Sequence, residues 1–198
     1  QIKTLDDFEN NNGWKEFIAD GVTLNISSEV GLNGNAIRFD YNFTKGTGYG
    51  GIEKFFAIDL PEKVEFTFNI KAVSPSNNFE IKFIDSTGNN VWWVNNRSYD
   101  FPKEWKKIRI KKRHINFAWG PTNDQSLKRI DRIEFTIASH VGGKGTVWID
   151  DLKFEPLLPE TNIYPNPLVL AKSQSFDLVP NNIVDGLLSS ISNSILRL

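Results

Sequence analysis

The side chains best suited to chemistry are aromatic rings that stand beside polar groups. Residues 79–94, FEIKFIDSTGNNVWWV, alternate apolar and charged side chains, turn, and return through Trp92 and Trp93. Adjacent residues of a strand face opposite sides of a sheet, so one indole can fill the core while the other faces solvent, a loop or a ligand. Further aromatic and amide or guanidinium groups follow in the sequence, and one tyrosine lies in a glycine-rich stretch: Asn95, Arg97, Tyr99, Trp119 and Tyr49.

These residue types suit recognition of sugars. Aromatic rings stack on the apolar faces of sugar rings, while Arg and Asn provide directional hydrogen bonds to hydroxyl groups. The sequence therefore predicts a carbohydrate-binding set made of Trp92, Trp93, Asn95, Arg97, Tyr99, Trp119 and Tyr49. Burial of the tryptophans in the core is the alternative, and the pattern alone leaves both open.

Carboxylates gather near both ends of the expected sheet region. Asp7 and Glu9 lie near the start of the chain, and Asp150 and Asp151 lie in its last apolar strand. If the first and last strands are neighbours, these oxygens converge, and hard oxygen ligands suit Ca²⁺. The other interpretation is solvated carboxylates, or carboxylates paired with Lys and Arg.

The motifs of common catalytic centres are missing from the sequence. The two histidines, His114 and His140, are in unrelated segments without an HExxH motif, and there is no GxSxG motif and no cysteine. Asp150 and Asp151 are neighbours on a strand and so face opposite ways, whereas glycoside hydrolysis needs two carboxyls facing one bond. We therefore predict that this chain is not itself an enzyme.

Charge and hydropathy narrow the range of partners. With 23 basic and 24 acidic residues the formal net charge is −1, which does not favour nucleic acid. No apolar run approaches the roughly 18 residues of a membrane span. The basic run 106–114 predicts a solvated cationic strand face paired with Glu80 or Glu134, with an acidic polysaccharide as the other interpretation. Because the chain begins at Gln1, we expect a processed protein or an excised fragment.

Period-2 apolar patterns separated by Gly, Pro and Asn turns predict about ten short strands and an all-β sandwich or barrel. A short helix or turn is expected at 126–132, and a loop at 45–51. We expect the β domain to cover residues 1–157, a proline-rich linker 158–167, and the truncated start of a second domain, or a tail, 168–198.

The opening LDDFENNNGW and the closing TVWIDDLKFEP resemble carbohydrate-binding modules of the galactose-binding-like jelly-roll group, family 11 above all, over residues 4–157. The resemblance implies a jelly-roll β-sandwich of two antiparallel sheets, with ligands on a sheet face or at the loop rim. It also implies a structural Ca²⁺ at Asp7 or Glu9 and at Asp151.

In function, the resemblance implies a non-catalytic polysaccharide-binding module of a secreted bacterial polysaccharide-degrading enzyme, tethered to a catalytic domain. A structural sandwich that packs against a catalytic domain is the alternative, and exposure of the tryptophans would separate the two. The tail sequence VPNNIVDGLLSS resembles the start of a discoidin (factor 5/8 type) domain.

Overall fold

The computed structural model describes residues 1–158, which form one compact unit. Its elements are β1 (Lys3–Asp6), β2 (Lys15–Ile18), β3 (Thr23–Val30), β4 (Asn35–Asn42), β5 (Tyr49–Asp59), β6 (Val64–Val73), β7 (Asn78–Ile84), β8 (Val91–Asn96), β9 (Lys106–Lys111), the 3₁₀ turn η1 (Lys112–His114), β10 (Asn116–Trp119), β11 (Arg129–Ala138) and β12 (Lys144–Pro156). The expected linker beyond Leu158 and the discoidin-like tail lie outside the described residues.

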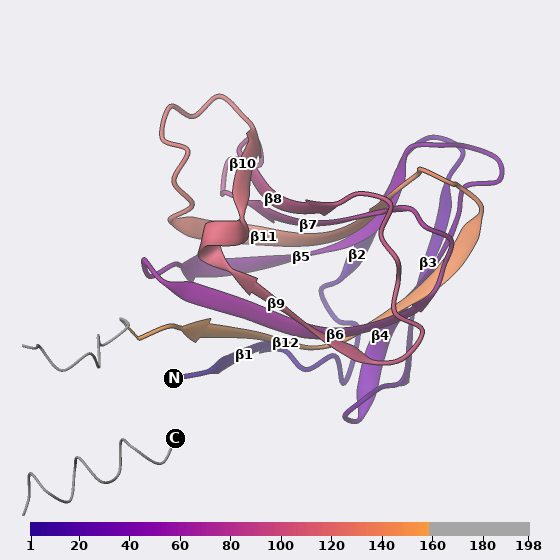
Figure 1. Cartoon of the computed structure of the whole chain (residues 1–198), viewed down its shortest axis with the longest axis horizontal. Helices are drawn as coiled ribbons and strands as arrows, with labels where there is room; N and C mark the ends of the chain where they lie inside the picture. The colour runs from indigo at the N-terminus through magenta and orange to yellow at the C-terminus, as the bar shows by residue number, and fades with distance from the viewer. Residues whose placement is uncertain (159–198) are drawn as a thin grey trace, which may run out of the picture. The chain divides into compact units, whose positions relative to one another are not determined.

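The strands form two six-stranded antiparallel sheets that face each other as two layers (Figure 1). Sheet A has the order β3-β4-β12-β6-β9, with β1 also paired to β12, and sheet B has the order β10-β8-β7-β11-β5-β2. The predicted jelly-roll β-sandwich of two antiparallel sheets is confirmed.

Alternating apolar side chains fill the space between the sheets. Phe66 and Phe68 of β6 meet Phe79 and Phe83 of β7, and Phe135 of β11 lies 5.0 Å from Phe68, measured between ring centroids. Each fully buried Phe contributes about 1.5–3 kcal/mol through burial. The period-2 pattern therefore fixes which side of every strand faces outward.

The first and last strands lie side by side, as predicted. Lys3 pairs with Phe154 and Thr4 with Lys153, in antiparallel register. The pairing is irregular near Leu152, where a bulge breaks the register of β12 and Asp151 adopts a positive φ of 55°. Asp150 and Asp151, at this irregularity, accept hydrogen bonds from the β3–β4 loop, which spans residues 31–34. Glu9, which follows β1, accepts one from Asn35 just after the loop.

Several local predictions are wrong. No helix or turn forms at 126–132, where an irregular segment leads into β11. The expected loop at 45–51 already enters β5 at Tyr49, and the sequence patterns did not predict the short strand β2. The basic run does not pair with Glu80 or Glu134, because β9 belongs to the other sheet: Arg109 pairs with Glu65 of β6 at 2.7 Å.

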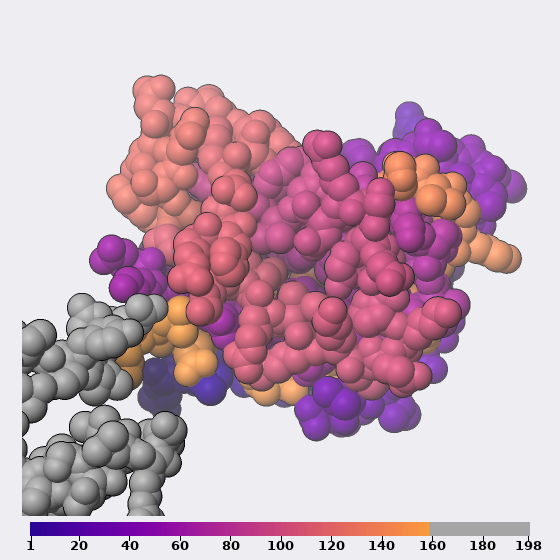
Figure 2. Space-filling view, viewed as in Figure 1, coloured from indigo at the N-terminus to yellow at the C-terminus, as the bar shows by residue number. Residues whose placement is uncertain are grey.

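The segment that leads from β8 to β9 crosses from sheet B to sheet A and covers the side of the sandwich turned toward the viewer (Figure 2). The three-residue η1 then returns the chain to sheet B. Within residues 1–158 no helix has the length and apolarity needed to cross a bilayer.

Candidate functional site

The outer face of sheet B combines aromatic rings with charged groups. The alternation that sends Phe79 and Ile81 inward sends Glu80 and Lys82 outward on β7. Strand pairing then fixes their neighbours, because Lys82 is opposite Trp93 on β8 and Glu134 on β11. We call this surface the aromatic face; its outward residues include Phe17, Tyr49, Glu53, Phe55, Glu80, Lys82, Trp93, Asn95, Trp119, Arg132, Glu134 and Thr136.

Lys82 is the centre of this face. Its ammonium nitrogen lies 5.9 Å from the Phe17 ring centroid, 6.0 Å from that of Tyr49 and 5.9 Å from that of Trp119. The three rings come from β2, β5 and β10, so side chains from both edges of the sheet converge on one lysine. Cation–π attraction holds such an arrangement together.

The rings of this face are open to solvent. Phe55 is 63% exposed, Trp119 49% and Tyr49 45%. Trp93 packs edge-on against Trp119, with centroids 5.4 Å apart and planes at 86°, which holds the Trp119 indole in place. A cluster of exposed aromatic side chains on one sheet face marks a binding surface more strongly than scattered single residues do.

A paired charge network lies beneath the rings. Lys82 Nζ is 3.1 Å from Glu80 Oε2 and 3.8 Å from Glu134 Oε2, while Arg132 is 3.1 Å from Glu134 and 3.3 Å from Glu53. Burial raises the pKa of Glu134 above its ordinary value, against the attraction of Lys82 and Arg132. These charges are nearly covered although they face away from the core, because the rings lie over them.

Some hydrogen-bonding capacity on this face is unused. Among the described residues four buried side-chain atoms lack a hydrogen-bond partner, and three of them belong here: Asn95 Oδ1, Thr136 Oγ1 and Arg132 Nε, although the last lies 3.3 Å from Glu53 Oε2 as an ion pair. Thr136 pairs with Gly51, over which the Phe17 ring lies, and this explains its burial. An unsatisfied buried polar group costs about 1–3 kcal/mol, and because these atoms are closed off from solvent, a ligand could reach them only if the covering side chains moved.

The structure brings together four of the seven predicted carbohydrate-binding residues: Trp93, Asn95, Trp119 and Tyr49. The structure excludes Trp92 from this set, because its side chain is only 5% exposed and its Nε1–H donates a hydrogen bond to the Gln125 carbonyl at 2.6 Å.

Two further predicted residues lie away from the aromatic face. Tyr99 is half-buried against Phe79 and Phe101 in the segment before β9, and burial raises its pKa. Arg97 is exposed beyond the end of β8.

Sequence reasoning missed Phe17, Phe55 and Lys82. Phe55 and Phe56 are adjacent aromatic residues in a strand, the same signal that singled out Trp92 and Trp93. Nothing local marks Phe17 or Lys82, because their roles depend on which strands become neighbours.

Two of the three carboxylates expected to bind calcium, Glu9 and Asp151, reach the β3–β4 loop, and Asp150 lies beside them. Asp150 Oδ2 accepts hydrogen bonds from the backbone N–H of Leu32 and Asn33 at 2.9 and 3.0 Å. Glu9 accepts from the Asn35 N–H at 3.2 Å, and Asp151 accepts from the Asn33 side chain at 2.7 Å.

Asp7 does not join this group. It is exposed, and its carboxylate accepts only the Glu9 N–H among the hydrogen bonds of the described residues. Of the three predicted calcium ligands, Glu9 and Asp151 therefore remain candidates, with Asp150 beside them.

The fit to a cation is partial. Asp150 is fully buried, and its Oδ1 has no hydrogen-bond partner, which leaves a carboxylate oxygen available to a hard cation. However, in residues 1–158 no three acidic or histidine side chains stand close enough together to form a metal site by themselves. Calcium here would need loop carbonyl or amide oxygens in addition to the carboxylates.

Comparison with solved structures identifies the fold. The family 11 carbohydrate-binding module of a cellulosomal cellulase from Clostridium thermocellum aligns with 82% of this chain and 98% of its own, at 23% identity and a TM-score of 0.63. The sandwich has the fold of family 11 carbohydrate-binding modules. A second structure of that module, in complex with a β-1,3-1,4-mixed-linked tetrasaccharide, has the same identity and TM-score and covers 80% of this chain.

The same fold also occurs inside a larger protein. An exo-β-agarase aligns with 80% of this chain but only 26% of its own length, at 17% identity and a TM-score of 0.55. No family model matches the sequence, and no curated protein matches it significantly.

Proposed function

We propose that this chain is a non-catalytic carbohydrate-binding module and that the aromatic face of sheet B is its glycan site. The observation that carries the proposal is the convergence of Phe17, Tyr49 and Trp119 around Lys82. Exposed rings would stack on the apolar faces of a neutral polysaccharide, and the partly exposed Glu53 and Arg132 side chains would hydrogen-bond to its hydroxyl groups.

The family 11 fold supports this proposal, since a module of that fold has been solved in complex with a β-1,3-1,4-mixed-linked tetrasaccharide. We further propose that the module belongs to a secreted polysaccharide-degrading enzyme and raises the local concentration of glycan at a tethered catalytic domain. The agarase that carries the same fold within a longer chain supports such an arrangement.

The alternative is a sandwich that packs against a protein partner. A protein-binding core is mainly apolar and depleted of charge. The aromatic face instead has five charged side chains under its rings, Glu53, Glu80, Lys82, Arg132 and Glu134, which favours a hydrated, hydroxyl-rich ligand.

Titration with a panel of soluble neutral polysaccharides, followed by calorimetry, tests the glycan site. We expect saturable binding that Trp119→Ala weakens more than tenfold, which is about 1.4 kcal/mol. Trp105→Ala is the matched control, because that partly exposed indole belongs to the other sheet and should leave neutral-glycan affinity unchanged. Equal loss in both variants would overturn the assignment of the glycan site to the aromatic face. No binding to any polymer by the folded protein would favour the protein-partner alternative.

We also propose that Ca²⁺ binds where Glu9, Asp150 and Asp151 meet the β3–β4 loop. The unpartnered Asp150 Oδ1 supports this. Calcium that binds only the folded state raises the melting temperature. The melting temperature of the chelated protein should therefore rise with added CaCl₂, and Asp150→Asn should abolish the rise while Asp7→Asn should not; a rise that survives Asp150→Asn would disprove this assignment.

A further inference from the structure

A second row of indoles and cations crosses the outer face of sheet A. Trp148 of β12 is opposite Arg38 on β4 and Lys71 on β6, and all three side chains face outward. The Lys71 nitrogen lies 4.8 Å from the centroid of the Trp148 ring and 5.2 Å from that of Trp105, which precedes β9. Lys71 is thus held between two partly exposed indoles.

The cations of this row differ in how they are paired. Arg38 lies 2.8 Å from Glu29 and 3.0 Å from Asp40, so its charge is matched twice. No carboxylate of residues 1–158 lies within salt-bridge distance of Lys71, or of Lys107, which faces outward opposite Asn69. The nearby Glu29 carboxylate interacts with Lys71 only at longer range. Lys71 and Lys107, on neighbouring strands, therefore both lack a carboxylate in direct contact.

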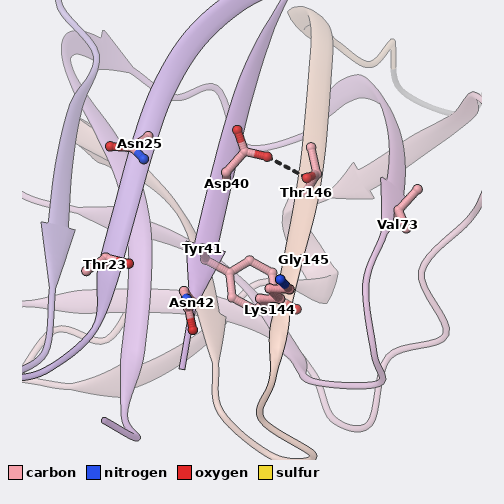
Figure 3. Close-up of a pocket in the computed structure, with 9 residues that line it drawn as sticks. All are labelled: Thr23, Asn25, Asp40, Tyr41, Asn42, Val73, Lys144, Gly145 and Thr146. Carbon is pink, nitrogen blue, oxygen red and sulfur yellow. Dashed lines mark hydrogen bonds between the residues drawn. The ribbon is translucent and has the colours of Figure 1, made fainter. Parts of the chain in front are cut away.

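A polar hollow of about 400 Å³ adjoins the row (Figure 3). Thr146, Val73 and Asp40 each lie two residues along their strands from Trp148, Lys71 and Arg38, so the hollow is on the same face. Its polar lining consists of hydroxyl and amide side chains, one lysine and the carboxylate of Asp40, which accepts a hydrogen bond from Thr146 and is paired with Arg38: Thr23, Asn25, Asn42, Thr146, Lys144 and Asp40.

We propose that this outer face of sheet A is a second glycan site and that its ligand is an acidic polysaccharide. Lys71 and Lys107 would bind the carboxylate or sulfate group of a sugar unit, the Trp105 ring would stack on that unit, and the hollow would take the hydroxyl groups of the next one. The anionic class follows from the unmatched cations, because a neutral sugar would leave both charges without a partner. The chain as a whole has a net charge of −1, so general attraction to polyanions does not explain such binding.

The experiment is affinity electrophoresis of the whole chain, near physiological salt, through gels containing polygalacturonate, dextran sulfate or uncharged dextran. We expect retardation by at least one of the acidic polymers and none by dextran. Lys71→Gln should weaken that retardation about tenfold, because it removes a charge-assisted contact to the anionic group, while Lys71→Arg should preserve most of it. Which acidic polymer binds separates carboxylate from sulfate recognition.

Lys45→Gln is the matched control, because it removes the same charge from an exposed glycine-rich loop. An equal effect of Lys45→Gln and Lys71→Gln would show non-specific attraction and overturn the proposal, as would the absence of retardation by both acidic polymers. Trp119→Ala should not affect retardation by acidic polymers, so this site and the aromatic face of sheet B can fail independently.

Discussion

The outer faces of the two sheets both hold a lysine among aromatic rings, but only one of these lysines has carboxylate partners. On sheet B, Lys82 contacts Glu80 and Glu134 beneath the rings, so its charge is matched within the protein and the exposed rings are the proposed binding surface. On sheet A, Lys71 lies between Trp105 and Trp148 without a carboxylate partner among the described residues. The difference teaches that a cation–aromatic cluster indicates a ligand class only after the cation's pairing is known.

The substitution with the largest expected effect destabilises both sheets, and so affects both outer faces at once. Phe135 is fully buried and packs against Trp14, Phe68 and Phe79, and thus joins the two sheets. Phe135→Ala should lower the free energy of unfolding by about 3–5 kcal/mol. Urea denaturation measures this, and glycan affinity on both faces should decline together in the destabilised protein; loss on one face alone would show that the two faces fold independently.

A glycine on each sheet offers a way to disturb one face without the other. An added Cβ at Gly51 would lie 2.5 Å from the Phe135 carbonyl and 2.7 Å from the Phe17 ring, so Gly51→Ala must displace that ring. Overpacking of this kind costs about 1–3 kcal/mol. Neutral-glycan affinity, measured by calorimetry, should fall while retardation by acidic polymers is retained.

Gly145→Ala is the corresponding change in sheet A, since its Cβ would lie 2.7 Å from the Tyr41 hydroxyl beside the polar hollow. It should weaken retardation by acidic polymers and leave neutral-glycan affinity intact. If each glycine variant affected both ligands equally, the separation of the two faces would be wrong.

The smallest expected effect is on stability, and it comes from ionisation of Glu134 beneath the aromatic face. The raised pKa of Glu134 means that the folded protein holds its proton more tightly than the unfolded chain, so ionisation there costs stability at neutral pH. Lys82, Arg132, Glu53 and Glu80 all face this carboxyl.

Glu134→Gln should therefore be at least as stable as the wild type at pH 7, and its advantage should vanish as the pH falls and wild-type Glu134 becomes protonated. Urea denaturation at pH 7 and at pH 4 measures the difference. An advantage that grows on acidification would show that the ion pairs with Lys82 and Arg132 outweigh the burial cost.

Most of the fold could be predicted from period-2 patterns, because in a strand with one buried face the alternation of apolar and polar residues shows which side chains face the core. The pattern of Phe79, Ile81 and Phe83 already places Lys82 outside the core. It does not reveal that Phe17 and Trp119, from opposite edges of sheet B, reach the same lysine, since strand order is a long-range property. Likewise, alternation placed Trp92 and Trp93 on opposite faces, but only the packing of Phe117 and Gln125 shows that Trp92 is the inner one.

The pairing of Lys3 with Phe154 also has a topological consequence. Antiparallel neighbours are about 5 Å apart, so the chain enters and leaves the sandwich at nearly the same point. A domain with this geometry can be inserted into a surface loop of a host protein without separating the host's own ends. It also allows circular permutation: joining residues 2 and 156 by a short glycine linker and opening the chain at the exposed Gly88 turn should yield the same sandwich.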